Sequence, residues 1–406
     1  MANIQSLRGM KDIIDNESKL FTYFVENCSK IVKKYGYEYI ETPILEETAL
    51  FKRSVGESSD IVSKEMYQFI DKGENDVCLR PEGTAGVVRW FVQNKKDRAG
   101  GNTRVFYHGP MFRYERPQKG RLREFHQFGC ESFGEANVYE DATIILMIDE
   151  LLKFFGINYK LKLNSLGCKD CMPLYRDNLV AHLNELTLCE DCNRRTATNP
   201  IRVLDCKNDN CQTSLKDAPK ITSSLCECCD TDFDRLKSIL EKNGVSYEID
   251  SNLVRGLDYY TQTAFEFVSD EIGAQSAIAG GGRYDRLVEF LGGKPTPAVG
   301  FAVGIERLLE LIKPNFEERE TLYIGAMSPE ALDTVFTLVS KKRQQIKVIT
   351  DYKSRSFSKH LNNAQKQGAT TVALIGEKEL EENSVWVKNL ETKEESTLIL
   401  EDYYKL

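Results

Sequence analysis

Hydrophobic and polar positions recur with two different periods along the first part of the chain. From Glu17 to Tyr35 the apolar residues return every three or four positions and Gly36 follows, which predicts an amphipathic helix that ends there. Residues 37–51 begin as a strand that stops at Pro43 and continue with helical residues. Asp141 to Phe155 has an apolar face and predicts another helix.

An antiparallel ribbon with a basic loop is predicted by the stretch FYHGPMFRYERPQKGRLREFHQFGCE. On strands, Arg113 would share a face with Glu115, and Phe125 would share a face with Gln127 and Glu131. A face that packs on a core is rarely so polar. The pattern therefore indicates that this face lines a pocket for an anionic ligand.

Two later changes of pattern divide the chain. From Cys168 to about Asp234 it is rich in Cys, Asn and Asp, which is typical of an insertion between strands, and strand patterns return after residue 245. From about Glu320 strands alternate with helices, which predicts parallel βαβ units in a separate small α/β domain.

Composition and charge narrow the class of protein. With 406 residues, 41% hydrophobic and 29% charged, the chain is expected to form two or three globular domains, without a membrane partner. No apolar run is long enough to span a bilayer and the start does not look like a secretory signal, so a cytoplasmic location is expected. The net charge of −8 excludes a histone-like coat but not local binding of nucleic acid. In this context the 12 cysteines favour thiols or a metal over disulfides.

Known phosphate-binding and hydrolase motifs are absent from the sequence. It has no GxxxxGK[ST] loop, no GxGxxG that opens a helix after a strand, no HExxH pair and no GxSxG elbow. A bound nucleotide would therefore be held by arginines on or beside strands, and the candidates are Arg113, Arg255 and Arg307. A surface salt bridge is the commoner role for any one arginine and stays open as the alternative for each.

A strand-to-helix junction offers a second candidate site. The stretch NDVCLRPEGTAGVVRWFV places Glu82 and Thr84 where a helix begins, a frequent position for ligand contacts. Thr84 as a simple helix cap is the alternative.

Several long stretches resemble a known family. GPMFRYERPQKGRLREFHQFGCE resembles motif 2 of the class II aminoacyl-tRNA synthetases in the form found in histidyl-tRNA synthetases. LVRGLDYYTQTAFEF resembles the histidine-binding segment of that family, and AGGGRYD and AVGFAVGIERL resemble its glycine-rich strand and motif 3. YGYEYIETPILE resembles motif 1, and AQKQGATTVALIGEKELEENSVWVKNLETKEE resembles the family's anticodon-binding domain.

The resemblance implies a fold and a domain plan. The fold would be α+β, with a central antiparallel sheet flanked by helices in the catalytic domain, which is split between residues 1–166 and 242–319. Residues 167–241 would form the Cys-rich insertion and residues 320–406 an α/β anticodon-binding domain. Motif 1 implies a homodimer.

The resemblance also assigns roles toward ATP, bound with Mg²⁺ as the substrate complex. Arg113 would grip the α-phosphate and the histidine carboxylate, Arg307 would lie on the γ-phosphate side, and Arg255 would neutralise the α-phosphate during attack. Phe125 would stack on the adenine, whose amino group would donate to Glu115. Arg121 would approach the terminal phosphates.

For L-histidine the resemblance implies, besides Arg113 and Arg255, two groups of binding residues. The ammonium end would be held by Glu82, Thr84, Gln127 and Tyr260, and the imidazole pocket would be lined by Glu131, Tyr259 and Tyr284. A substrate without ring nitrogens would leave buried polar groups unpaired, at a cost of about 1–3 kcal/mol each.

The implied reaction has two steps. The histidine carboxylate attacks the α-phosphorus and releases pyrophosphate, and the terminal ribose hydroxyl of histidine tRNA then attacks the carbonyl of the histidyl-adenylate. The RPQKGR loop, with Arg116 and Gln118, would face the acceptor end of the tRNA. Lys353 and Arg355 would contact the tRNA from the C-terminal domain, although a solvated charged face is the commoner reading of such a run.

Cysteine spacing in the insertion raises the question of a metal. Paired CxxC motifs are a zinc signal, and Cys189, Cys192, Cys206 and Cys211 are candidate ligands of a structural zinc that activity would not need. Reduced thiols are the alternative.

Two other functions compete with a histidine--tRNA ligase. One is a histidine-sensing regulatory relative of the catalytic domain, which would lack the C-terminal domain and the ATP-binding residues that this sequence keeps. The other is a sister synthetase for glycine, proline or threonine, against which LVRGLDYY and RPEGTAG favour histidine.

Overall fold

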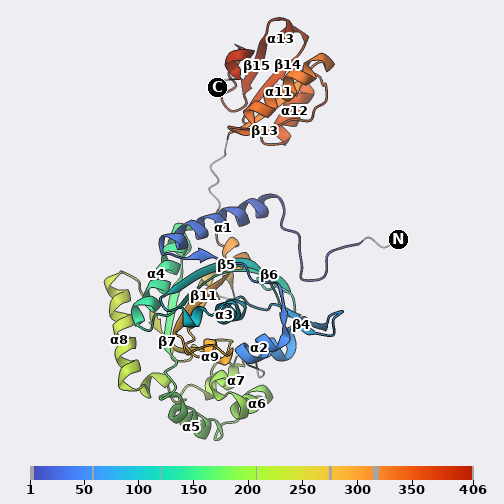
Figure 1. Cartoon of the computed structure of the whole chain (residues 1–406). Coiled ribbons are helices and arrows are strands. Elements are labelled where there is room, and N and C mark those ends of the chain that lie inside the picture. Colours follow the sequence, from blue (N-terminus) through green and yellow to red (C-terminus); the bar gives the residue numbers. More distant parts are fainter. Residues whose placement is uncertain are drawn as a thin grey trace. The chain divides into compact units, whose positions relative to one another are not determined.

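The computed structural model describes residues 4–56, 59–118, 120–206, 208–273, 277–313 and 320–404. The chain divides into two compact units, Met1–Pro314 and Asn315–Leu406, and each is described by itself (Figure 1). Within the described ranges, no helix combines the length and apolar character needed to cross a bilayer.

An eight-stranded sheet organises the first unit. Its strands are β1 (Glu38–Tyr39), β5 (Thr103–Phe112), β6 (Glu124–Phe133), β7 (Lys160–Ser165), β8 (Glu248–Ile249), β9 (Thr261–Val268), β10 (Ala277–Arg283) and β11 (Ala298–Gly304). They lie in the order β1-β5-β6-β11-β10-β9-β7-β8. The six central strands pair antiparallel, whereas β1 and β8 at the edges pair parallel with β5 and β7. The predicted α+β class is confirmed, with a sheet that is mixed at its edges.

Helices and a small second sheet complete the catalytic part of this unit. The small sheet has the order β2-β4-β3, with β2 (Leu45–Glu47), β3 (Gln68–Ile70) and β4 (Asp76–Leu79). The helices are α1 (Asp15–Lys34), α2 (Thr48–Val55), α3 (Thr84–Gln93), α4 (Val138–Phe154), α9 (Leu287–Phe290) and α10 (Ile305–Leu309).

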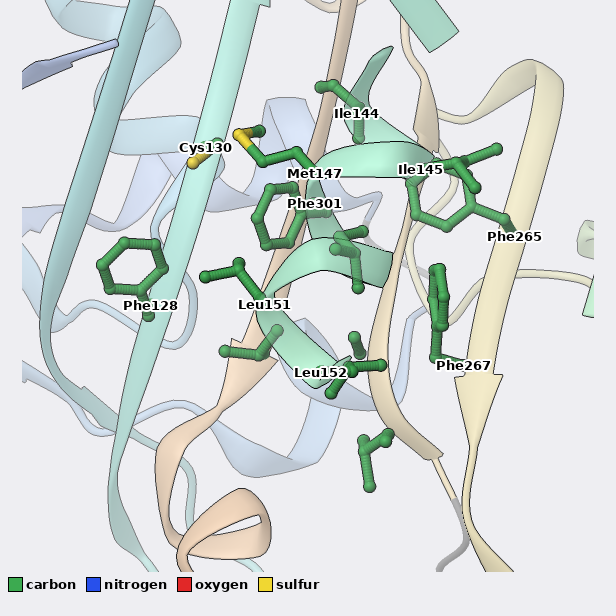
Figure 2. Close-up of a cluster of buried hydrophobic side chains, with 14 of the residues drawn as sticks. Phe128, Cys130, Ile144, Ile145, Met147, Leu151, Leu152, Phe265, Phe267 and Phe301 are labelled. Atoms are coloured by element: carbon green, nitrogen blue, oxygen red, sulfur yellow. The ribbon is translucent and has the colours of Figure 1, made fainter. Parts of the chain in front are cut away.

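The main core lies between the large sheet and helix α4. Buried α4 side chains such as Met147 and Leu151 pack with phenylalanines from β6, β9 and β11 (Figure 2). On β6, Phe128 and Cys130 belong to this core, and because side chains alternate along a strand, Gln127 and Glu131 point to the opposite face. One face of the sheet thus packs in the hydrophobic core, and the other carries the polar side chains.

The polar ribbon is confirmed, but its first strand ends earlier than the alternation predicts. β5 and β6 pair antiparallel from Thr103–Phe133 to Phe112–Glu124. Arg113 and Glu115 lie just beyond β5, because the Tyr114 N–H donates to the carbonyl of Glu65 rather than to the partner strand. Arg113 and Glu115 are therefore positioned by a loop and not by the strand.

The segment between β7 and β8 is helical. It contains α5 (Met172–Leu183), α6 (Glu190–Thr198), α7 (Asp209–Ser214) and α8 (Glu227–Lys242). α8 packs beside α4, and its Phe233, Leu236 and Leu240 join the main core, whereas α5 to α7 surround a small core of their own (Figure 1).

The second unit is built on a five-stranded sheet, in the order β13-β12-β14-β15-β16. Its elements are β12 (Thr321–Ala326), α11 (Leu332–Lys342), β13 (Lys347–Ile349), α12 (Phe357–Lys366), β14 (Thr371–Ile375), α13 (Glu377–Glu381), β15 (Ser384–Asn389), β16 (Glu395–Ile399) and α14 (Leu400–Tyr403). β12 pairs parallel with β13 and β14, as the alternation of strands and helices predicts. The last two strands form an antiparallel hairpin.

Candidate active site

A cavity of about 920 Å³ lies on the face of the large sheet that carries Gln127. Its lining includes all three arginines proposed from the sequence, Arg113, Arg255 and Arg307. These residues are separated by up to 194 positions in the chain, since 307 − 113 = 194. The fold therefore brings together cationic side chains that the sequence could only suggest one at a time.

Arg113 is fixed at the end of β5. Its Nε donates to the carbonyl of Pro81 at 2.9 Å, and its guanidinium carbon lies 5.1 Å from the centroid of the Phe125 ring. Phe125 is the second residue of the returning strand β6 and also lines the cavity. The pair gives the cavity an aromatic surface beside a cation, which suits a planar base attached to a phosphate.

Arg255 reaches the cavity from the loop before β9. Its Nη1 donates to Oε2 of Glu266 at 2.7 Å, and its guanidinium carbon lies 5.7 Å from the ring centroid of Tyr260. Burial by itself lowers the pKa of Arg255, but Tyr260 and Glu266 outweigh it and the pKa is raised. Gly280 leaves the space that Arg255 needs, because a Cβ there would lie 2.4 Å from Nη1.

Arg307, on the short helix α10, is held by main-chain carbonyls. Nε donates to Gly120 at 3.0 Å and Nη1 donates to Ala277 at 2.9 Å. Burial lowers its pKa, and the positive charges of Arg121 and Arg113 lower it further. The cavity thus concentrates positive charge, and a bound polyanion would reduce the repulsion between these arginines.

Glu115 and Arg121 face each other across the basic loop. Oε2 of Glu115 lies 2.6 Å from Nε of Arg121, and both side chains line the cavity. The resemblance gave them separate roles toward the adenine and the terminal phosphates, and those roles remain predictions.

A buried polar niche adjoins the cavity and is centred on Glu131. Its Oε1 accepts hydrogen bonds from the hydroxyls of Thr84, at 2.7 Å, and Tyr107, at 3.3 Å, while its Oε2 accepts from Tyr284. Burial raises the pKa of Glu131 to about 8, although these donors act in the opposite direction. Gly300 makes room for the carboxylate, since a Cβ there would lie 1.8 Å from Oε2.

Glu82, rather than Thr84, caps helix α3. Its carboxylate accepts from the backbone N–H groups of Thr84, at 2.7 Å, and Ala85, at 2.8 Å, and burial raises its pKa. The alternative that Thr84 caps the helix is wrong, because its hydroxyl donates to Glu131 instead.

Several buried polar atoms of the cavity wall have no hydrogen-bond partner among the described residues. Two of them, Oε1 of Gln127 and the hydroxyl oxygen of Tyr259, belong to uncharged side chains. Burying such groups without a partner is costly, so both favour a polar ligand in the space that they line. Tyr259 also touches Tyr260 and Tyr284, at ring-centroid distances of 4.7 and 5.6 Å.

The remaining predicted residues lie away from the niche. Arg116 and Gln118 are exposed on the loop between β5 and β6. In the second unit, Lys353 is exposed, and Arg355 forms an ion pair with Asp351. Their contact with tRNA stays a prediction.

Sequence reasoning missed several residues of the site. Tyr107 has the parity of a β5 side chain that faces the niche, a signal that was available in the ribbon. Asp209, Gln212 and Lys216 also line the cavity, and they come from the insertion, for which no local pattern indicates contact with the arginines.

Comparison with known proteins finds two family models that match the chain. A family model described as histidyl-tRNA synthetase matches residues 9–171 and 181–308, and a model described as anticodon binding domain matches residues 322–406.

Relatives extend over nearly the whole chain. A histidine--tRNA ligase from Sulfurovum sp. (strain NBC37-1) is 61% identical over 401 residues, 98% of this chain and 100% of the relative. Another, from Sulfurimonas denitrificans, is 62% identical over 402 residues, 98% of this chain and 99% of the relative. The crystal structure of apo S. aureus histidyl-tRNA synthetase superimposes with a TM-score of 0.84 at 35% identity, over 99% of each chain. The chain belongs to the histidyl-tRNA synthetase family.

Proposed function

We propose that the chain is a histidine--tRNA ligase that activates L-histidine with ATP and then transfers the histidyl group to the 3′ end of histidine tRNA. The observation that carries this proposal is the convergence of Arg113, Arg255 and Arg307 on one cavity that adjoins the Glu131 niche. One half of the site suits a triphosphate and the other suits a small polar ring.

In the first step, a carboxylate oxygen of histidine attacks the α-phosphorus of ATP, the bond to the β-phosphate oxygen breaks, and pyrophosphate leaves. Arg255 neutralises charge on the α-phosphate, while Arg113 and Arg307 hold the phosphate chain in line. No side chain needs to act as a nucleophile. Arg121, on the cavity side of the loop, would approach the terminal phosphates.

The adenine would lie on Phe125, whose ring is backed by Arg113. Its amino group would donate to Glu115, which keeps free lone pairs beside its contact with Arg121. Mg²⁺ would enter with ATP as part of the substrate.

The imidazole of histidine would enter the niche formed by Glu131, Tyr259 and Tyr284. A ring N–H can donate to Glu131, and the hydroxyl of Tyr259, which has no hydrogen-bond partner in the described part of the chain, is available to a ligand. The ammonium group would be held by Glu82, Thr84, Gln127 and Tyr260, of which Gln127 offers an unpartnered buried oxygen.

In the second step, the terminal ribose hydroxyl attacks the carbonyl of the adenylate, and AMP leaves. Arg116 and Gln118 project from the exposed loop beside the cavity and would guide the acceptor end. The second unit matches an anticodon-binding model, and its Lys353 and Arg355 would contact tRNA phosphates there.

A homodimer belongs to the same proposal. Tyr39, Ile44 and Leu45, in the stretch that resembles motif 1, are 46%, 41% and 43% exposed, and a second copy would cover them. Light scattering on purified protein tests this: a mass of one chain at micromolar concentration contradicts it. A cytoplasmic location remains a prediction from the sequence.

The deciding experiment is histidine-dependent exchange of pyrophosphate into ATP, followed by charging of histidine tRNA. We expect both activities with histidine and neither with proline, glycine or threonine. Exchange with proline but not histidine would refute the specificity. Histidine binding without exchange would favour the regulatory alternative.

A further inference from the structure

Eight cysteines of the insertion form two groups of four. In the first group (Cys168, Cys171, Cys226 and Cys229) one sulfur from each residue lies within 4.8 Å of all the others. The same holds for the second group (Cys189, Cys192, Cys206 and Cys211). The cysteines are free thiols, so no disulfide explains why they gather.

The spacing of the sulfur atoms matches the edge of a metal tetrahedron. The Sγ of Cys168 lies 3.7 Å from that of Cys171 and 3.8 Å from that of Cys226, and Cys189 and Cys206 are 3.9 Å apart. Four sulfurs bound to one Zn²⁺ at about 2.3 Å are separated by about 3.8 Å in a regular tetrahedron. A disulfide needs about 2.05 Å, so the observed spacing fits one ion and no covalent bond.

Backbone N–H groups point at sulfurs in both groups. The N–H of Cys226 donates to Sγ of Cys171 at 3.1 Å, and the N–H of Cys189 donates to Sγ of Cys211 at 3.2 Å. Hydrogen bonds of this kind stabilise negative charge on sulfur and orient the ligands of a metal.

The hydrophobic core of the insertion is small, so little apolar burial is available to stabilise its fold. α6 has nine residues and α7 has six, and three cysteines of the second group belong to the small core that they surround. Small units with little apolar core commonly depend on a metal or on disulfides.

We propose that the insertion holds two structural Zn²⁺ ions, each bound by four cysteine thiolates. The sequence indicated only the second group as a candidate site. The first group pairs a CxxC beside β7 with a second CxxC (Cys226 and Cys229) that begins 55 residues after Cys171, a pairing that only the fold reveals.

The first ion joins the entry and exit of the insertion. Cys168 and Cys171 follow β7, which pairs with β9 in the large sheet, while Cys226 immediately precedes α8 and Cys229 lies on it. Because α8 is packed in the main core, this ion ties both ends of the insertion to the catalytic part.

The second ion supports a wall of the active-site cavity. Cys206 and Cys211 bracket Asp209 and adjoin Asp205 and Gln212, three residues that line the cavity. The ion thereby links the fold of the insertion to the shape of the substrate site.

Elemental analysis of the full-length protein, purified without chelator, tests the proposal. We expect about two zinc ions per chain in the wild type and about one in each of the double variants Cys171→Ser/Cys226→Ser and Cys206→Ser/Cys211→Ser. Cys228→Ser is the matched control, since Cys228 is exposed and belongs to neither group, and it should keep two.

Titration of the wild type with a mercurial in the presence of a zinc indicator does not depend on how the variants fold. We expect release of two zinc ions as the thiols react. Zinc below one equivalent in the wild type, iron in its place, or an equal loss of zinc from Cys228→Ser would overturn the proposal. None of these readouts depends on ligase activity.

Discussion

The hydroxyl of Thr84, at the first residue of helix α3, donates a hydrogen bond of 2.7 Å to Oε1 of Glu131 on strand β6. This bond joins the strand-to-helix junction to the face of the large sheet. It places Glu82, which caps the same helix, beside the carboxylate at the centre of the niche. Two acidic groups thus share a buried site, and the charge of Glu82 helps burial to raise the pKa of Glu131.

The pH dependence of stability should report on Glu131. Burial moves its pKa from 4.5 to about 8 on folding, so between these values the folded protein keeps a proton that the unfolded chain releases. This stabilising contribution is complete below about pH 4.5 and is lost as the pH rises toward 8, by at most about 1.4 kcal/mol per pH unit. Glu131→Gln should flatten that slope in urea unfolding between pH 5 and 8. The exposed Glu241→Gln is the control, and parallel slopes for Glu131→Gln and wild type would contradict the assignment.

Arg255 should be needed for adenylate formation even when a positive charge is kept. Arg255→Lys loses the planar fork that Glu266 holds, and we expect histidine-dependent pyrophosphate exchange to fall about 100-fold or more. Arg98→Ala, which removes an exposed arginine elsewhere in the same unit, should leave exchange unchanged. Full activity of Arg255→Lys would show that charge alone suffices.

A single methyl group should distort the histidine niche from the opposite strand. In Gly300→Ala the new Cβ would lie 1.8 Å from Oε2 of Glu131, so the carboxylate must move and the KM for histidine should rise. Gly304→Ala on the same strand is the matched control, because a Cβ there would lie no closer than 3.7 Å to another residue, at Cδ of Arg307, and would not reach Glu131. Equal KM values in the two variants would mean that Glu131 does not contact histidine. Circular dichroism distinguishes this effect from misfolding.

Charge reversal in the second unit should separate the two reaction steps. Lys353→Glu removes a cation that we place on the tRNA backbone, so KM for tRNA should rise and the salt dependence of tRNA binding should fall by about one unit of logarithmic slope. Pyrophosphate exchange should be unaffected. Lys378→Glu on α13 is the control, since Lys378 is 76% exposed in the same unit. Equal loss of exchange and charging by Lys353→Glu would contradict this division of labour.

Local patterns predicted the parts of the site that are local. Arg113, Phe125 and Gln127 lie within one ribbon, where the period of two and the turn residues are visible in the sequence. Glu82 and Thr84 were placed correctly at a junction, but the sequence did not show which of them caps the helix. That outcome depends on Glu131, a partner 47 residues away from Thr84.

Contacts over long distances in the chain account for what the sequence did not reveal. Asp209 and Gln212 line the cavity because the insertion folds back over it, and the polar residues of a short helix carry no sign of their neighbour. The pairing of Cys168 and Cys171 with Cys226 and Cys229 is equally non-local. CxxC spacing identifies half of such a site and leaves the other half open.

The two faces of strand β6 differ in character, because one faces the hydrophobic core and the other faces the substrate site. A slip of one residue against β11 would exchange Phe128 and Cys130 with Gln127 and Glu131, so that polar groups would meet helix α4 and aromatic rings would fill the substrate site. Misaligned molecules would lose their hydrophobic core together with their chemistry. Cellular proteases that degrade unstable chains would therefore also remove chains with a misformed substrate site. A folded enzyme with poor substrate specificity would not accumulate.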